Sequence, residues 1–356
     1  MARYAVILAG GRGTRFWPRS RKRKAKQVLP FLGDKTLIQQ TVSRLGPLFP
    51  PENVWILTNE HLRQEIIRQL PEVPKKQVLA EPAQRNTAPC IGLAARLLHE
   101  QDPDAVMAVF PADHLISRPP RFLRVVRSAL RAAGTGKIVV IGIQPRWAET
   151  GYGYVEFPEG ATPGEMKPLP VLKFREKPDQ ETAERYLAAG HFFWNSGMFF
   201  WRADVLLEAL RRHIPKTATL LAGLPPRNSS RFGKVLRETF PLCENISIDY
   251  AVLEKASNVV GIAAGDFGWN DVGSWNAVYE LDRRDEAGNV ARTDAIFSAS
   301  SGNFVDAPGK LAALVGVRDL VIVDTPDALL VADRSRAQQV SDLVKLLERL
   351  KRDDLL

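Results

Sequence analysis

The sequence contains few cysteines, few histidines and no long apolar run. Cys90 and Cys243 are its two cysteines, and neither has a His or Cys neighbour, which argues against a disulfide framework or a thiolate metal site. The five histidines show no metal-ligand spacing, and no Gly-x-Ser-x-Gly motif of a hydrolase is present. No apolar run can span a membrane, and Arg12, Arg15 and Arg19 interrupt any secretory signal. We therefore expect a cytoplasmic chain without membrane association, in which both cysteines are buried.

Acidic residues are absent from residues 1–33, which hold nine of the 49 lysines and arginines. The remaining 40 bases are matched by the 40 acidic residues, so the net charge of +9 belongs to this one segment. Because the segment follows an apolar strand and contains several glycines, it indicates a polyphosphate ligand in preference to nucleic acid. The consecutive cations Arg21, Lys22, Arg23 and Lys24 point in several directions, and we expect most of them to be solvated.

Apolar runs of strand length alternate with amphipathic segments over the first 150 residues. Strands are predicted at residues 4–8, 54–57, 105–110 and 138–143, and helices at 36–45, 61–70, 86–100 and 121–132. This alternation predicts an α/β fold with a parallel sheet covered by helices. In such folds ligands bind beyond the carboxyl ends of the strands, so the loop after the first strand is the first candidate site.

The pattern changes after about residue 150. Aromatic strands are predicted at 152–157, 172–175 and 192–201, followed by helices at 205–212, 231–238 and 248–255. From residue 288 onward, short strands at 295–298, 303–305, 312–317, 320–323 and 329–331 predict a small all-β unit that ends in an amphipathic helix over 337–350. We expect a catalytic domain over residues 1–287 and a second domain over 288–356. The apolar stripe of the last helix predicts core packing, with a homodimer formed through the C-terminal region as the alternative.

The strongest local motif is residues 8–18, directly after the first strand. Three of the four residues 10–13 are glycine, which lets backbone N–H groups approach phosphate oxygens closely. The motif lacks the Gly-Lys-Ser/Thr of a Walker A loop, and Phe16 stands where a dinucleotide fingerprint has its third glycine. A mononucleotide-type phosphate loop is therefore predicted. The alternative, a plain strand-to-helix turn, would not require Arg15 and Lys26 beside the glycines.

Together with Lys-Gln-Val-Leu-Pro at residues 26–30, this loop resembles the signature of the sugar-1-phosphate nucleotidyltransferases. Further segments, in order, resemble the mannose-1-phosphate guanylyltransferase branch of that family: Glu81-Pro82, Arg-Asn-Thr-Ala-Pro at 85–89, Phe-Pro-Ala-Asp-His at 110–114, Phe-Arg-Glu-Lys-Pro at 174–178, Asn-Ser-Gly-Met-Phe at 195–199 and Trp-Asn-Asp-Val-Gly-Ser-Trp at 269–275. The resemblance covers about residues 3–282. It implies a Rossmann-like, three-layer nucleotidyltransferase fold with a mixed, mostly parallel sheet, followed by a left-handed β-helix-like unit and a terminal helix.

The resemblance also implies an activity. The chain would transfer GMP from GTP to α-D-mannose 1-phosphate, forming GDP-mannose and pyrophosphate with Mg²⁺ as cofactor. The alternatives are the same chemistry with another hexose 1-phosphate or nucleoside triphosphate, and a non-catalytic regulatory paralogue that binds a nucleotide sugar. The cupin-type isomerase domain of longer relatives is not expected, because residues 288–356 contain no histidine.

Roles for individual residues are carried over from the resemblance. Arg15, Lys26 and Lys177 are the expected catalytic cations, and Asp113 and Asp271 the expected metal ligands. The expected nucleotide-binding residues are Leu8, Ala9, Gly10, Gly11, Gly13, Thr14, Arg15, Lys26, Glu81, Asn86, Thr87 and Asp113. The expected sugar phosphate-binding residues are Gly151, Glu176, Lys177, Asn195 and Asp249.

Several of these residues have structural alternatives. Two isolated carboxylates suit Mg²⁺, which takes one or two protein oxygens and fills its other positions with water and phosphate. Helix capping is the alternative for Asp113, and for Asp271 ahead of a helix over 272–281. Capping is equally an alternative for Asp249 and for the pair Asn86 and Thr87. For Lys177 the alternative is a solvated cation at a strand end, and the Asn195 amide has backbone partners as its alternative.

Overall fold

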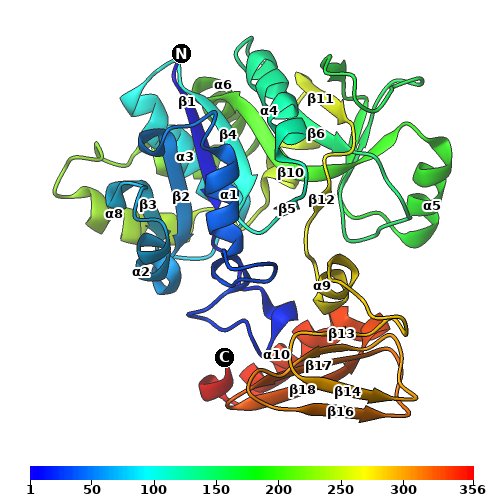
Figure 1. Ribbon diagram of the computed structural model, residues 1–356. Coiled ribbons are helices and arrows are strands. Elements are labelled where there is room, and N and C mark those ends of the chain that lie inside the picture. Colours follow the sequence, from blue (N-terminus) through cyan, green and yellow to red (C-terminus); the bar gives the residue numbers. More distant parts are fainter.

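The computed structural model describes all residues, 1–356 (Figure 1). Its centre is a ten-stranded sheet in the order β3-β2-β1-β4-β10-β6-β11-β8, with β7 and β9 attached beside β10. The strands are β1 (Arg3–Leu8), β2 (Val54–Asn59), β3 (Val78–Glu81), β4 (Val106–Pro111), β6 (Ile138–Ile143), β7 (Tyr154–Glu156), β8 (Leu169–Pro170), β9 (Lys173–Arg175), β10 (Phe192–Arg202) and β11 (Val259–Ala264). A small two-stranded sheet of β5 (Leu115–Ile116) and β12 (Trp269–Asn270) lies beside it.

Strand direction decides where the site opens. β1 pairs in parallel with β2 and β4, and β6 with β11, whereas β10 runs antiparallel between β4 and β6. The predicted mixed, mostly parallel sheet is therefore confirmed. The carboxyl ends of β1 and β4 are adjacent, with Leu8 in register with Pro111, so the loops after both strands start side by side. The register of β10 against β6 shifts between Asn195 and Phe199.

Helices cover both faces of the sheet. On one face lie α1 (Leu37–Leu45), α2 (Glu60–Gln69) and α4 (Pro119–Ala133); on the other lie α3 (Thr87–Gln101), α6 (Ala203–His213), α7 (Pro215–Ala222) and α8 (Phe232–Thr239). Each face has its own apolar cluster, of 40 and 39 buried residues respectively. The three-layer arrangement follows directly from the amphipathic periodicity of these helices. Helix α5 (Gln180–Ala189) packs outside, against β10.

The sequence explains where α1 begins. Thr36 accepts a hydrogen bond from the Gln39 backbone N–H, and the Gln39 side chain accepts one from the Thr36 N–H, which is a complete capping box. Leu37, Ile38 and Leu45 then face the sheet or the loops beside it and are fully buried. The segment thus carries both its start signal and its apolar face.

Residues 290–356 form a separate β unit below the α/β part, with the C-terminus at its edge (Figure 1). β13 (Val290–Ala291), β15 (Phe304–Asp306) and β17 (Leu320–Thr325) pair in parallel, β18 (Ala328–Asp333) closes antiparallel on β17, and β14 (Ala295–Ser298) pairs in parallel with β16 (Ala312–Val315). The terminal helix α10 (Val340–Arg349) follows a 3-10 turn over Arg334–Gln339. Parallel pairing between successive short strands is the arrangement expected of a β-helix.

The β unit packs onto the segment that follows β1. One apolar cluster joins Phe16 and Trp17 to Trp275 of α9 (Trp275–Leu281), to Phe304 of β15 and to Val344 of α10. The predicted core role of the C-terminal stripe is confirmed for Val340, Val344 and Leu347, whereas Leu350 is exposed. The C-terminal unit therefore supports the loop region where the charge excess lies.

Several boundaries differ from the sequence predictions. The helix predicted over 248–255 is a single π-helical turn, Asp249–Leu253, and the last helix begins at Val340 because a 3-10 turn precedes it. The helix suggested over 272–281 begins at Trp275 with Ser274 as its N-cap. Strands β3 and β11 and helices α5 and α7 were not predicted. None of the helices is both long enough and apolar enough to cross a membrane.

Candidate active site

A cleft of about 1120 Å³ opens at the carboxyl ends of β1 and β4. Its walls come from segments far apart in the sequence: Leu8 and Arg15, Pro111 and His114, residues 146–153, residues 194–197 and residues 269–277. Most of the motifs predicted to carry function therefore meet around one cavity.

The phosphate loop is held by side chains behind it. Gln27 Nε2 donates to the carbonyl oxygens of Ala9 (2.7 Å) and Gly11 (3.0 Å), and Ser20 Oγ donates to the Arg12 carbonyl (2.9 Å). The backbone N–H groups of residues 10–13 have no hydrogen-bond partner in the protein. A fixed loop with unpaired N–H groups is able to bind an anion such as phosphate.

Thr14 and Arg15 follow in a short 3-10 turn, Thr14–Phe16. Arg15 lines the cleft, and its guanidinium lies 3.5 Å from the Gly273 carbonyl across it. The loop thus brings one long cationic side chain to the cleft, while Lys26 comes from the second turn behind it.

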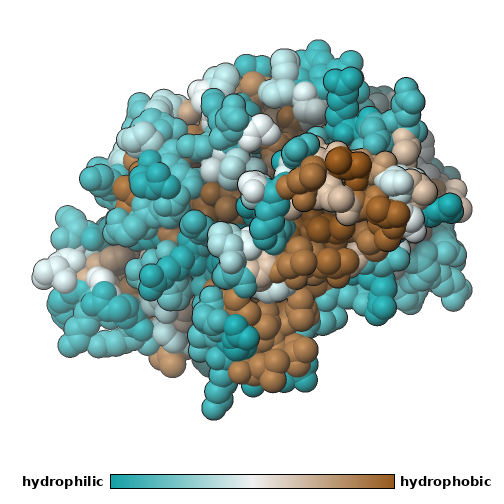
Figure 2. Space-filling model, turned by 60° about the horizontal axis from the view of Figure 1, so that its bottom comes forward, coloured by the Kyte–Doolittle hydropathy of each residue, from teal (hydrophilic) through white to brown (hydrophobic).

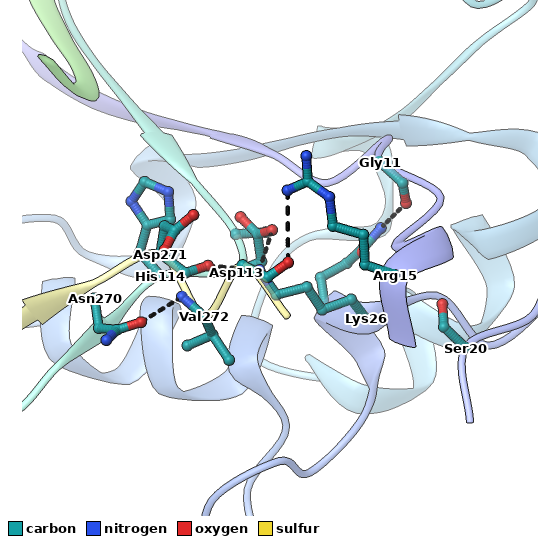
Figure 3. A network of polar contacts seen from close by, with 12 residues as sticks. Gly11, Arg15, Ser20, Lys26, Asp113, His114, Asn270, Asp271 and Val272 are labelled. Carbon is teal, nitrogen blue, oxygen red and sulfur yellow. Dashed lines mark hydrogen bonds and ion pairs between the residues drawn. The ribbon is translucent and has the colours of Figure 1, made fainter. Parts of the chain in front are cut away.

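Lys26 joins the two predicted metal ligands. Its buried ammonium lies 2.7 Å from Asp113 Oδ2 and 2.7 Å from the Asp271 carbonyl oxygen, so residues 26, 113 and 271 meet at one point (Figure 3). Burial, the largest single effect, would raise the pKa of Asp113, but the charge and hydrogen bond of Lys26, with smaller contributions from His114 and a backbone hydrogen bond, together hold that pKa below its ordinary value. Asp113 is therefore ionised at neutral pH, and it caps no helix.

Asp271 is positioned by a tight turn. Asn270 Oδ1 accepts from the Val272 N–H (2.6 Å), and Val272 has a left-handed φ of 48°. Tyr152 donates its hydroxyl to Asp271 Oδ1 (2.6 Å), and burial raises the pKa of Tyr152, so the hydroxyl stays a donor. An added Cβ at Gly273 would stand 2.8 Å from Asp271 Oδ2, so the glycine leaves space for this oxygen. The suggestion that Asp271 caps the following helix is wrong, because Ser274 is the N-cap.

Two carboxylates from separate loops, each with an oxygen that no protein group occupies, fit a hard divalent cation. The donor set is oxygen only and offers no cluster of three His, Cys, Asp or Glu side chains. The remaining ligands would then have to come from water and from phosphate.

His114 is a cleft residue that sequence reasoning did not single out. The Trp269 indole N–H donates to His114 Nδ1 (3.1 Å), and burial lowers the pKa of His114 to about 4. The imidazole is thus neutral, with its hydrogen on Nε2. Its position directly after Asp113 is the signal by which the sequence could have identified it.

The far end of the cleft carries the predicted sugar residues. Lys177 donates to Glu176 Oε1 (2.6 Å), and Asn195 donates to Asp249 Oδ1 (3.0 Å). Glu176 Oε2 is buried without a hydrogen-bond partner, and a Cβ at Gly153 would stand 2.4 Å from it. An unpaired buried acceptor is costly unless a ligand donates to it, so this oxygen is available to a donor group of a ligand.

Charges at this end are balanced against each other. Burial raises the pKa of Asp249 to about 6, and the neighbouring Glu176 adds to that rise. Burial lowers the pKa of Lys177, but the hydrogen bond and charge of Glu176 raise it. The net result is a pKa above the ordinary value of lysine. Asp249 begins the π-helical turn, but Ile248 is its N-cap and the Asp249 carboxylate faces Asn195 instead. Gly151 lines the cleft, with its N–H donating to Glu149 Oε1 (2.8 Å).

The third group of predicted residues lies between β3 and α3. Glu81 ends β3, and an added Cβ at Gly10 would stand 3.4 Å from its Oε1, which brings the carboxylate to the phosphate loop. Asn86 is the N-cap of α3 and accepts from the Thr87 N–H (2.9 Å), while Thr87 Oγ1 accepts from the Ile248 N–H (2.8 Å). Both residues thus have structural partners, although Thr87 also lines the cleft.

Three of the four consecutive cations at residues 21–24 are exposed, as predicted. Arg21 pairs with Asp327 (2.9 Å), Lys22 pairs with Asp353 (3.0 Å), and Arg12 forms an ion pair with Glu348. Arg23 and Lys24 are exposed and make no ion pair, as predicted. Lys22 is also exposed despite its ion pair, so the prediction fails for Arg21 alone. Its acidic partner Asp327 lies in the C-terminal unit, 306 positions along the chain, and no local pattern indicates it.

Comparisons with known proteins identify the family of the chain. The Nucleotidyl transferase family model matches residues 4–288, and the MannoseP isomerase/GMP-like beta-helix domain model matches residues 295–347. A mannose-1-phosphate guanylyltransferase of Klebsiella pneumoniae is 40% identical over 353 residues, which cover 98% of this chain and 74% of that protein. The alginate biosynthesis protein AlgA of Pseudomonas aeruginosa is 37% identical over 362 residues, which cover 98% of this chain and 73% of that protein.

A solved structure gives the same result for the fold. The Thermus thermophilus protein described as mannose-1-phosphate geranyltransferase superposes with a TM-score of 0.85 at 32% identity, covering 98% of this chain and 100% of that one. Both the fold and the order of domains are thus shared over almost the whole length. The chain belongs to the nucleotidyltransferase family, in the branch of the mannose-1-phosphate guanylyltransferases that carry a β-helix domain.

Proposed function

We propose that this protein transfers GMP from GTP to α-D-mannose 1-phosphate and releases pyrophosphate, the reaction named by its relatives. The observation that carries the proposal is the meeting of Lys26, Asp113 and Asp271 beside a phosphate loop whose N–H groups are unpaired. This arrangement gathers positive charge and metal ligands, and no nucleophile or proton-transfer chain, at the end of the cleft.

GTP would lie with its phosphates on the glycine loop and its base toward Glu81. The N–H groups of residues 10–13 and the cations Arg15 and Lys26 supply the positive potential that a triphosphate needs. Guanine offers an N1–H and an N2 amine, two adjacent donors that one ionised carboxylate accepts together. Glu81 is the carboxylate at the loop that can do this.

Mg²⁺ is the metal that we assign to Asp113 and Asp271. When bound, it neutralises phosphate charge and orients the triphosphate. Tyr152 donates a hydrogen bond to one Asp271 oxygen and leaves the other free, and the Lys26 ammonium balances the negative charge of Asp113. The chain's own contribution is thus to hold both residues beside Lys26 and to leave one oxygen of each carboxylate without a protein partner.

The sugar phosphate would lie at the opposite end of the cleft. Glu176 Oε2, Asn195 and Asp249 present polar groups to the hexose hydroxyls, and Lys177 brings a cation toward the phosphate. Because residue 153 is glycine, the space beside Glu176 Oε2 is open, whereas a side chain at position 153 would fill it.

The reaction then needs alignment more than acid–base chemistry. A phosphate oxygen of mannose 1-phosphate forms a bond to the α-phosphorus of GTP, and the bond from that phosphorus to the bridging α–β oxygen breaks. Pyrophosphate leaves with the bond electrons, and no covalent enzyme intermediate forms. The cations Arg15, Lys26 and Lys177 hold the two anions in line, which is the main contribution a protein makes to phosphoryl-type transfer.

A substrate grid tests this proposal. Pyrophosphate release is measured for several nucleoside triphosphates against several hexose 1-phosphates, with Asp113→Asn and Asp271→Asn beside the unchanged protein. Turnover should peak at GTP with mannose 1-phosphate and fall at least about a hundredfold in both variants. A different best pair would overturn the substrate assignment, and binding of GDP-mannose without any turnover would favour a regulatory paralogue.

We also propose that two copies of the chain pair through residues 288–356, which we treat as a domain distinct from residues 1–287. Aliphatic side chains of this unit that are more than half exposed support the pairing: Ile296, Leu311, Val315, Leu329 and Val331. Figure 2 shows a broad apolar patch on the face of the molecule that carries the C-terminal unit. A patch of this kind usually marks an interface. Val315→Lys should convert a dimer to a monomer in light scattering, and a monomeric unchanged protein would contradict the proposal.

A further inference from the structure

Cys90 contacts the carboxylate that we assign to guanine. It lies one turn into α3, it is 5% exposed, and its Sγ is 3.1 Å from Glu81 Oε1. This is the one hydrogen bond that the Glu81 side chain makes within the protein. Its other oxygen, Oε2, is not sealed off and has no protein partner, so it can accept from a ligand.

No charged group stabilises the Glu81 carboxylate. The phosphate loop brings Gly10 against it and β2 brings Asn59 into register with it, and neither carries a charge. Helix α2 also packs on β3, but its Arg63 donates to the Val78 carbonyl at the opposite end of that strand.

Burial raises the pKa of Glu81 to about 7, and the hydrogen bond from Cys90 opposes that rise; no cation contributes, including Arg85 in the following loop. Burial, and then the charge of Glu81, raise the pKa of the Cys90 thiol, so the sulfur keeps its hydrogen and remains a donor. The thiol is therefore the one protein group that favours the ionised carboxylate.

The protonation state of this carboxyl decides which base it fits. An ionised carboxylate only accepts, which matches the N1–H and N2 amine of guanine. A neutral carboxylic acid has one donor and one acceptor, which matches N1 and the N6 amine of adenine. A site whose polar groups match one base rejects the other, because a mismatch leaves buried groups unpaired.

We propose that Cys90 is a specificity-determining positioning residue, whose thiol holds Glu81 in the acceptor-only form and so favours GTP over ATP. The proposal rests on the assignment of Glu81 to the base. Base selection then depends on one S–H···O contact and on pH, because no cation stabilises the Glu81 carboxylate.

The test compares kcat/KM for GTP and for ATP from about pH 6 to about pH 9, the range in which a carboxyl with a raised pKa titrates. The variants are Cys90→Ala, which removes the donor, Cys90→Ser, which restores one, and Glu81→Gln, which imitates the neutral acid. Cys243→Ala is the matched control, because Cys243 is also buried and forms no hydrogen bond with Glu81.

We expect the GTP preference of the unchanged protein to fall as pH drops through the titration of Glu81. Cys90→Ala should shift that midpoint upward and lower the GTP-over-ATP ratio at neutral pH about fivefold, the size of one hydrogen bond. The loss should appear in the nucleotide KM, vanish at high pH and be rescued by Cys90→Ser. Glu81→Gln should lose both the preference and its pH dependence, while Cys243→Ala changes neither.

Two results would separate the possible errors. A Cys90→Ala profile equal to that of the unchanged protein, or lowered equally for both nucleotides at every pH, overturns the role of Cys90 alone. A Glu81→Gln protein that still prefers GTP overturns the base assignment itself. If Cys90→Ala does not fold, Cys90→Ser decides: it should keep the GTP preference, and a loss of it overturns the proposal.

Discussion

Two glycines of the phosphate loop should respond in opposite ways to alanine. Gly13 has a φ of 62°, and a non-glycine residue there costs about 1–2 kcal/mol. An added Cβ would also stand 2.6 Å from Lys26 Cβ and 2.9 Å from its backbone nitrogen, and such overpacking costs about 1–3 kcal/mol. Gly13→Ala should therefore lower the free energy of unfolding by about 2–5 kcal/mol, and displace the cation that holds Asp113.

Gly11 is the matched control, because an added Cβ there meets no atom within 4 Å and its φ is not positive. Gly11→Ala should leave the free energy of unfolding within about 1 kcal/mol, since alanine restricts only the unfolded chain. Its Cβ nevertheless occupies the surface that phosphate must approach. The KM for GTP should rise about tenfold, the cost of one weakened hydrogen bond to a charged group.

Urea unfolding followed by tryptophan fluorescence measures the first quantity, and initial rates at varied GTP measure the second. A Gly13→Ala protein as stable as the unchanged one would refute the steric argument. A Gly11→Ala protein that loses as much stability as Gly13→Ala, or that binds GTP normally, would refute the separation of the two roles.

Three further changes test other contacts. Tyr152→Phe removes the hydroxyl from Asp271 Oδ1 and should raise the metal concentration needed for half-maximal activity about tenfold; an unchanged metal requirement contradicts this. Lys177→Gln should raise the KM for mannose 1-phosphate far more than the KM for GTP, with partial recovery in Lys177→Arg, and equal effects on both would exclude its assignment to the sugar phosphate. Asp306→Asn breaks the paired hydrogen bonds from Arg19 (2.6 and 3.1 Å) and should lower the free energy of unfolding by about 1–2 kcal/mol. A free energy of unfolding, measured by denaturant titration, within about 0.3 kcal/mol of that of the unchanged protein would show that the contact does not stabilise the fold.

The regular elements were readable from local patterns. The four early strands and four early helices lie where periodicity predicts them, because each carries its own apolar face, and α1 also carries its own capping box. The direction of β10 was not readable. An apolar strand buried on both faces looks the same whether it runs parallel or antiparallel, and only its neighbours β4 and β6 decide.

The site was predictable as a set of residues but not as contacts. Asp113 and Asp271 stand at strand ends and turns, which suggested ligands, yet the ion pair from Lys26 crosses 87 positions and no local pattern encodes it. The contact between Cys90 and Glu81 was missed for a similar reason. A buried cysteine normally behaves as a small apolar residue, and its donor matters here only because the fold places a carboxylate beside it.

The most direct test follows the α-phosphorus of GTP. The protein is incubated with a divalent cation, mannose 1-phosphate and GTP labelled at that phosphorus, and the products are separated. Direct transfer predicts that the label appears in GDP-mannose, in an amount equal to the pyrophosphate released, and that neither product forms with Asp271→Asn. Label appearing in free GMP or GDP instead, or GDP-mannose formed without pyrophosphate, would contradict the account.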